Sequence, residues 1–524
     1  MAEKGTYITT RVPYEEALDR AGFSRYNIWI FAICASITFT TTFEVNSGPY
    51  IATGSACELN TTVKQQGLFE SIPTLGVFMT MHLWGYLADT RGRQRMLTIN
   101  LFMSFITGIV ASFSTHWIVL LVLKCIASAV VGAAMMTSLT LLSECTPTKH
   151  RSTLVILTSS AYLVACGLMA AIAKVILPLE FSFYVPILGI YFNSWRLLNL
   201  IFAVPSAISA VLCMQTYESP KYLLCAGRDE DALDVLKKIY TMNNWNDTDY
   251  YKVIGLLSNR VPHFQVESLE LEEVQIDQSN KGFFKSVIER TLPMVKVPVR
   301  RYFHVLSGLY TVTYATMAAF FATTPFILDA IVKSAGSEKR LSICDMIRSS
   351  INNTSVLQKS EDCPLDTGAL VPVFGITMIL AIYNVVMGIM TYRISRKTLF
   401  IGMQLVAGLA GLLINTSYLW VLSSILFTVF ISAIVNISFL NSYSVEVFPT
   451  YYKASAVCLL PLGGRGNASM AIKLIARLLN NNCELAFYIF GGIAFAGGFI
   501  AFLLPSEQTM KEHRQKLKPV ASQE

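Results

Sequence analysis

Four ionisable side chains lie inside long apolar stretches of this 524-residue sequence: Glu44, Lys124, Lys174 and Arg465. A charged group at the centre of a bilayer costs about 2.5–3.5 kcal/mol on insertion scales, so each needs a partner or a polar cavity. Burial would raise the proton affinity of Glu44, and a nearby lysine would oppose this. Two interpretations of Glu44 stay open: a proton carrier in a transport cycle, or a structural ion pair with Lys174.

Lys174 itself has a second interpretation. It lies four residues before Pro178, near the end of its apolar stretch. A lysine at such a position can extend its aliphatic chain and place the ammonium at the membrane interface.

The composition requires a membrane protein. Hydrophobic residues make up 53% of the chain, charged residues only 14%, and the mean hydropathy is +0.50. The net charge of +7 comes from basic residues that cluster in short turns between apolar stretches, which is a topology signal and not a nucleic-acid surface. We therefore expect the partners to be a lipid bilayer and a small-molecule substrate, with no nucleic acid.

Apolar stretches of roughly 20 residues, each enough for one spanning helix, predict twelve transmembrane helices in an all-α membrane protein. They form two six-helix bundles, at 27–214 and 302–504, the second interrupted by an outer loop at 327–366. The rest of the chain is an N-terminal segment, a central linker and a tail, at 1–26, 215–301 and 505–524. An amphipathic helix in the linker, with apolar residues from Ala232 to Ile239, is expected to lie on the membrane surface or on the protein.

Basic residues predict the orientation. Arginines and lysines crowd the turns at 91–95, 149–151 and 393–397, whereas the short loops on the other side have almost none. Cytoplasmic loops carry this excess, so both termini are expected in the cytoplasm. The membrane is either the plasma membrane or that of an intracellular vesicle.

The two bundles are related by an internal repeat. Glu144 follows one apolar stretch and Glu446 follows another in a similar turn, with an offset of 446 − 144 = 302 residues. The same offset carries Asp89, in GYLADTRGRQR, onto Thr391, next to the basic turn YRISRK. The two bundles are therefore expected to be pseudo-symmetric, and the second turn lacks the acid.

These motifs resemble the major facilitator superfamily. The resemblance rests on GYLADTRGRQR, on the glutamate-containing turns of both halves and on ESPKYLL after the sixth predicted helix. Together with NSWRLLNLIFAVPS and EDCPLD, they are similar to the synaptic vesicle glycoprotein 2 and related-protein branch of the organic-ion and sugar porters. The resemblance implies the superfamily fold and a solute transporter.

The resemblance also implies a cytoplasmic gate. Its aspartate would cap the N-terminus of a facing helix, a placement worth roughly 0.3–1 kcal/mol in exposed settings. The alternative is a solvated basic turn that only sets topology. The expected gate residues are Gly85, Asp89, Gly92, Arg93, Glu144, Arg151, Glu446 and Lys453.

A central cavity is the second implication. Its charged residues would be Glu44, Lys124, Lys174 and Arg465, and one acid among several bases favours an anionic or zwitterionic substrate. Tyrosines at helical spacing are alternatively packing residues, whereas asparagines in a membrane helix need polar partners. The remaining candidates are Tyr310, Tyr314, Phe321, Asn384, Asn436 and Asn441.

The predicted outer loops carry two further kinds of site. Asn60, Asn352 and Asn353 each begin a glycosylation triplet. Cys344 and Cys363 are a candidate disulfide, although connectivity does not follow from sequence.

No sequence motif indicates an enzyme, a cofactor or a metal site, and there is no phosphate-binding loop for ATP. The favoured hypothesis is a monomeric secondary active transporter that moves a small organic solute, with an organic ion as the best class, by alternating access and with proton coupling left open. The other is a membrane protein of the same fold that serves in binding or trafficking and transports nothing.

Overall fold

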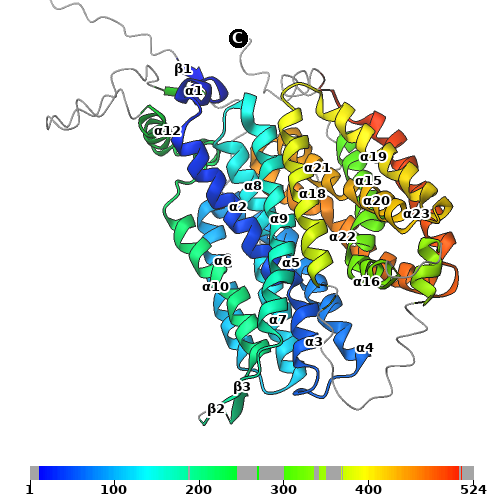
Figure 1. Cartoon of the computed structure of the whole chain (residues 1–524). Coiled ribbons are helices and arrows are strands. Elements are labelled where there is room, and N and C mark those ends of the chain that lie inside the picture. The colour runs from blue at the N-terminus through cyan, green and yellow to red at the C-terminus, as the bar shows by residue number, and fades with distance from the viewer. Residues whose placement is uncertain are drawn as a thin grey trace, which may run out of the picture.

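The computed structural model describes residues 11–186, 189–244, 268–270, 300–334, 341–349, 368, 370–506 and 509. Within this part the chain is almost entirely helical, and its long helices run between two ends of the molecule (Figure 1). One end carries the short helix α1 (Tyr14–Ala21), and the other carries a hairpin of β2 (Phe183–Val185) and β3 (Ile190–Phe192). We call them the α1 end and the hairpin end.

The N-terminal half begins with β1 (Arg11–Pro13), which pairs in parallel with β4 (Ser268–Glu270). Gly132 lies between α7 and α8, where α5 packs closely, since a Cβ there would lie 2.6 Å from Val77 of α5. The long helices are α2 (Arg25–Asn46), α5 (Leu68–Arg91), α6 (Arg93–Ser112), α7 (Trp117–Val131), α8 (Ala134–Glu144), α9 (Thr148–Ile176) and α10 (Ser194–Met214), with α3 (Gly48–Ser55) and α4 (Val63–Gln66) at the hairpin end.

The C-terminal half has the same kind of helices. A π-helical turn, η2 (Tyr314–Ala318), interrupts its first long helix. The elements are α15 (Arg300–Thr313), α16 (Ala319–Ser334), α18 (Leu370–Met390), α19 (Arg396–Leu413), η3 (Ile414–Thr416), α20 (Trp420–Ile431), η4 (Ser432–Val435), α21 (Asn436–Val447), η5 (Thr450–Tyr452), α22 (Lys453–Asn481), α23 (Cys483–Ile500) and η6 (Ala501–Leu503).

Nine helices of the described part are long and apolar enough to cross a membrane, counting α7 with α8 and α20 with α21 as single runs. The chain is therefore an all-α, multi-pass membrane protein, as the composition predicts. The two halves meet along two seams, where α9 packs against α18 and α5 packs against α22.

Two short helices follow the N-terminal half. They are α11 (Pro220–Cys225) and α12 (Asp229–Asn243), and α12 is the amphipathic helix expected in the linker. Its apolar residues from Ala232 to Ile239 are buried against α11, α1 and α2. The helix therefore lies on the protein at the α1 end (Figure 1).

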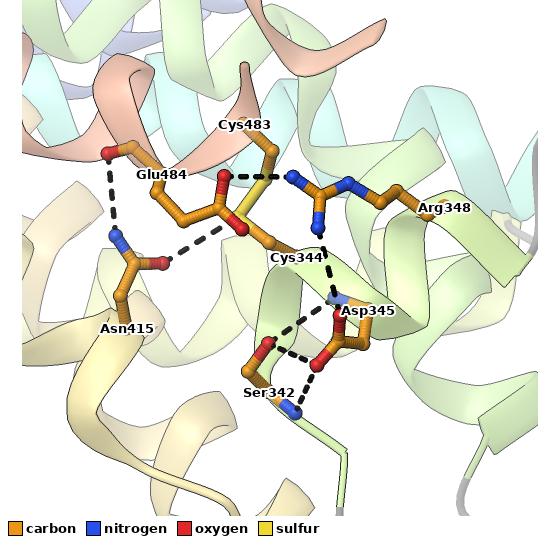
Figure 2. Close-up of a disulfide and its surroundings, with 7 residues drawn as sticks. All are labelled: Ser342, Cys344, Asp345, Arg348, Asn415, Cys483 and Glu484. Atoms are coloured by element: carbon orange, nitrogen blue, oxygen red, sulfur yellow. Dashed lines mark hydrogen bonds and ion pairs between the residues drawn. A yellow bond between two sulfur atoms is a disulfide. The ribbon is translucent and has the colours of Figure 1, made fainter. Parts of the chain in front are cut away.

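The expected disulfide between Cys344 and Cys363 is wrong. Figure 2 shows Cys344 bonded to Cys483, at the start of α23 and 139 residues away. Arg348 reinforces the contact through an ion pair of 2.8 Å with Glu484. Connectivity follows from which segments meet at the hairpin end, and sequence proximity does not reveal it.

Cys363 lies outside the described residues, as do the glycosylation candidates Asn352 and Asn353. Asn60 is exposed in the turn after α3.

Candidate functional site

A cavity of about 1110 Å³ lies between the two halves. Its walls come from α2, α3, α5 and α9 on one side and from η2, α16, α18, α21 and α22 on the other. Thr53, Cys57 and Gly67 line it and are exposed at the hairpin end. The cavity is therefore accessible from the hairpin end.

Arg465 of α22 is the charged residue deep in this cavity. Its Nε donates to the Tyr314 hydroxyl over 3.5 Å, and its guanidinium carbon lies 6.0 Å from the centre of the Tyr314 ring. The preceding Gly464 allows this contact, because a Cβ there would lie 2.8 Å from the backbone oxygen of Tyr310. Tyr314 begins the π-helical turn η2, a distortion that is frequent at functional sites.

Two polar residues of the cavity, Asn46 of α2 and Tyr162 of α9, were not among the sequence candidates. Asn441 of α21, which was among them, also lines the cavity. The Asn441 Oδ1 accepts a 2.7 Å hydrogen bond from Tyr310, which is itself buried behind the cavity wall. Helical spacing could have identified Asn46, because Thr42 and Asn46 lie on the same face of α2 and line the cavity together with Thr53 of α3.

Glu44 and Lys124 do not line the cavity. The Lys124 Nζ lies 2.6 Å from the Glu44 Oε1, and both side chains are buried inside the N-terminal half. The Glu44 Oε2 lies next to Gly108 of α6 and has no hydrogen-bond partner among the described residues. The proposed pairing of Glu44 with Lys174 is therefore wrong, and Lys174 is a half-buried residue away from the cavity.

Two of the three asparagines among the candidates join helices instead of facing the cavity. Asn384 of α18 donates to the Ile156 carbonyl and to Ser160, which links the two halves at the α9–α18 seam. Asn436 donates to Gln404 over 2.5 Å within the C-terminal half. Of the ten candidate cavity residues, the structure therefore places four in the lining: Tyr314, Phe321, Asn441 and Arg465.

At the hairpin end, Glu58 fixes α3, which carries Thr53 of the cavity lining. Its carboxylate accepts hydrogen bonds from Arg196 and Trp195 at the start of α10, and from Asn193. Burial raises the pKa of Glu58, but these hydrogen bonds outweigh burial, so the pKa is lowered.

At the α1 end, the gate aspartate reaches across to the other half. The Asp89 carboxylate accepts from the backbone N–H groups of Ala454 and Ser455, over 3.0 and 2.8 Å, and from the Ser455 hydroxyl over 2.7 Å. These N–H groups belong to the first turn of α22 and have no acceptor within the helix. Gly85 permits the approach, since a Cβ there would lie 2.9 Å from the Ala454 carbonyl oxygen.

Arg93 ties Asp89 to a second acid. Its guanidinium lies 3.2 Å from Asp89 and 3.2 Å from Glu144, and donates to the Thr450 carbonyl of the other half over 2.9 Å. Lys453 of the C-terminal half lies 3.6 Å from Glu144. We call Asp89, Arg93, Glu144 and Lys453 the α1-end lock.

Glu218 of ESPKYLL supports this lock and was not among the predicted residues. It accepts hydrogen bonds from the N–H groups of Arg93 and Gln94, at the N-terminus of α6. Gly92 has φ of 102°, and a Cβ there would lie 2.4 Å from the Glu218 carboxylate. Only a glycine fits this turn.

The remaining gate candidates pair within their own halves. Arg151 lies 2.7 Å from Glu15 of α1, and Glu446 lies 2.9 Å from Arg396 of α19. Thr391, the counterpart of Asp89, shares a 2.9 Å hydrogen bond with Thr153 of α9.

Comparison with known proteins agrees with this geometry. A model of the sugar (and other) transporter family matches residues 23–257. The solved structure of the proton:xylose symporter XylE bound to 6-bromo-6-deoxy-D-glucose superposes with a TM-score of 0.64, at 16% identity, over 94% of this chain and 99% of that one. The chain has the major facilitator superfamily fold.

Curated relatives agree with the resemblance to the synaptic vesicle branch of the superfamily. The organic cation/carnitine transporter 7 of Arabidopsis thaliana is 26% identical over 45% of this chain and 44% of its own length. The synaptic vesicle 2-related protein of Rattus norvegicus is 29% identical over 44% of this chain and 39% of its own length. The chain thus spans less than half the length of these relatives, and the predicted resemblance is confirmed.

Proposed function

We propose that this protein is a secondary active transporter that moves a small organic ion across a membrane by alternating access. The observation that carries the proposal is one cavity between two halves, accessible from the hairpin end and closed at the α1 end by contacts between the halves. Two rigid halves that alternate between this closure and the opposite one would carry a solute across the bilayer. The transporter names of the family model and of the Arabidopsis relative support a small organic solute.

We further propose twelve spans, with α5, α22 and the run from α15 to α16 added to the nine apolar helices. These three contribute cavity-lining residues, including Arg465, and polar lining lowers the hydropathy of a spanning helix. The bundles would then be 27–214 and 302–504. The basic turns lie at the α1 end, which supports a cytoplasmic location for that end and for both termini.

The Glu44–Lys124 pair is our candidate for proton coupling, acting beside the cavity and not within it. Protonation of Glu44 would release Lys124 from a contact of 2.6 Å and leave an unpaired buried charge, which would change the packing of α2 against α7. In proteoliposomes, Glu44→Gln should remove the dependence of uptake on a pH gradient while solute exchange continues. Unchanged pH dependence in this variant would contradict the assignment.

A reversible cross-link at the α1 end tests alternating access. The hydroxyl oxygens of Thr153 and Thr391 lie 2.9 Å apart across the α9–α18 seam, so a Thr153→Cys and Thr391→Cys double variant should form a disulfide. We expect the oxidised variant to bind its solute from the hairpin end but to show no counterflow in proteoliposomes. Reduction should restore the flux.

The single variant Thr391→Cys, oxidised and reduced in the same way, controls for effects of the reductant on the native Cys344–Cys483 bond. Flux that continues through a fully cross-linked protein would exclude alternating access. Binding without flux in the wild-type protein would favour a binding or trafficking role.

A further inference from the structure

We propose that the cavity takes an organic anion, with its negative group on Arg465 and an apolar or aromatic body along the walls. The inference uses the proposed function only in treating the cavity as the solute site. It names a class of substrate that differs from the cation in the printed name of the Arabidopsis relative.

The charge of the cavity points to an anion. Its lining contains two cationic residues, Arg465 and Lys473, and no aspartate or glutamate among the described residues. An ammonium or quaternary ammonium solute would meet repulsion from the deep arginine and would find no carboxylate there. A carboxylate solute would meet a guanidinium, which binds such groups through two parallel hydrogen bonds.

Arg465 is partly buried, and it differs from the buried arginines of the described residues in having no carboxylate partner. In the described ranges, no carboxylate oxygen lies within 4.0 Å of its guanidinium, and its side-chain hydrogen bond goes to the Tyr314 hydroxyl. A partly desolvated guanidinium without an anion is destabilised, and a bound anion would offset that cost. The buried arginines of the described residues each have a carboxylate partner; they are Arg93, Arg151, Arg196 and Arg396.

A second donor is available in the same cavity. Asn441 is fully buried and lines the cavity, and its Nδ2 has no acceptor among the described residues. Its Oδ1 already accepts from Tyr310, which leaves the donor end of the amide for a ligand. Donors on α22 and on α21 therefore suit a ligand that only accepts hydrogen bonds, as an ionised carboxylate does.

The rest of the lining suits an organic body and not an inorganic anion. The cavity volume of about 1110 Å³ is slightly above the range of roughly 300–1,000 Å³ for sites that hold drug-sized ligands, so an organic solute fits inside. Much of its wall is apolar or aromatic and would bury an apolar body. Examples are Val45, Tyr50, Leu163, Met169, Phe321 and Ile472.

The test compares solutes that differ only in charge. Arylacetates built on phenyl, indole and naphthalene rings, the matching arylethanols and the matching arylethylammonium ions would be titrated into the purified full-length protein by calorimetry and thermal shift. We expect at least one arylacetate to bind, and to bind at least tenfold more tightly than its alcohol and its ammonium analogue. Binding of the ammonium series in preference, or of no arylacetate at all, would overturn the proposal.

Variants of α22 locate the anionic group. We expect Arg465→Gln to weaken arylacetate binding by about 10- to 100-fold, the range for hydrogen bonds to charged groups, and Arg465→Lys to weaken it less. Arg477→Gln is the matched control, because Arg477 is an exposed arginine on the same helix outside the cavity. Equal losses in the Gln variants at 465 and 477 would contradict a site on Arg465.

These outcomes are separable from those of the transport proposal. Arylacetate binding that depends on Arg465, without flux, would retain the anion site and reject transport. Flux of an ammonium solute that survives Arg465→Gln would retain transport and reject the anion site.

Discussion

At the α1 end, the last turn of α5 carries Asp89, and Thr391 follows α18 at the equivalent position of the repeat. Their partners are equivalent as well, since Ser455 and Thr153 are 455 − 153 = 302 residues apart. Asp89 makes three hydrogen bonds to the first turn of α22, whereas Thr391 shares one hydroxyl contact with Thr153 of α9. At equivalent positions of the repeat, the α5–α22 seam is therefore held by a charged group, and the α9–α18 seam by a neutral pair of hydroxyl groups.

The difference is large in energetic terms. A hydrogen bond to a charged group contributes about 1.5–3 kcal/mol, compared with about 0.5–1.5 kcal/mol for a neutral one. Backbone spacing adds to it, because Gly85 brings α5 against the backbone of α22, whereas Met387 occupies the equivalent position of α18. We therefore expect the closure of the α1 end to depend mainly on the α5–α22 seam and on the carboxylate of Asp89.

The largest expected effect comes from removing that charge. In Asp89→Asn, the amide keeps one acceptor oxygen, and its NH₂ group faces an N–H donor that it cannot satisfy. We expect the amides of Ala454 and Ser455 to exchange with deuterium about 10- to 100-fold faster, since they have no other acceptor. Hydrogen-exchange mass spectrometry of the segment 450–458 would measure this.

Asp19→Asn is the matched control for Asp89→Asn. Asp19 is an acid of α1 that accepts a 3.3 Å hydrogen bond from the N–H of Thr148, at the first turn of α9. We expect its loss to leave exchange at 450–458 unchanged. Equal protection of 450–458 in wild type and Asp89→Asn would show that the two seams do not differ as described.

The resemblance to the superfamily was sufficient to predict that Asp89 would cap a facing helix, because the motif that carries it is local, but it did not say which helix. GYLADTRGRQR contains the close-packed glycine, the acid and Arg93 within nine residues. The facing helix α22 begins after the turn that contains Glu446, which the internal repeat relates to the turn at Glu144. The geometry at Asp89 follows the expectation, since a carboxylate at a helix N-terminus is favourable wherever the two elements meet. What the motif could not reveal was Glu218, which reaches this turn from 125 residues away.

The cavity was predicted less well, for a physical reason. An ionisable residue in a membrane helix needs a partner, but the partner can lie within one bundle, as Lys124 does for Glu44. Asn46 is only two residues from Glu44, and successive residues of an α-helix are about 100° apart, so the two side chains point to nearly opposite sides of α2. The charge of Glu44 made it the more conspicuous of the two in the sequence, but Asn46 is the one that lines the cavity.

The smallest expected effect concerns the neutral seam. Thr391→Val removes the hydroxyl that contacts Thr153, but Thr391 also donates to the Gly388 carbonyl within its own turn, so little of its hydrogen bonding depends on the other half. We expect exchange in the segment 148–156 to rise only two- to threefold, about 0.5 kcal/mol, at the low end for a neutral hydrogen bond. Thr391→Asp provides the converse test, because a carboxylate at this position would face the Thr153 hydroxyl and slow exchange there. A tenfold rise in Thr391→Val would show that the seam without a charge contributes to closure as much as the one that contains Asp89.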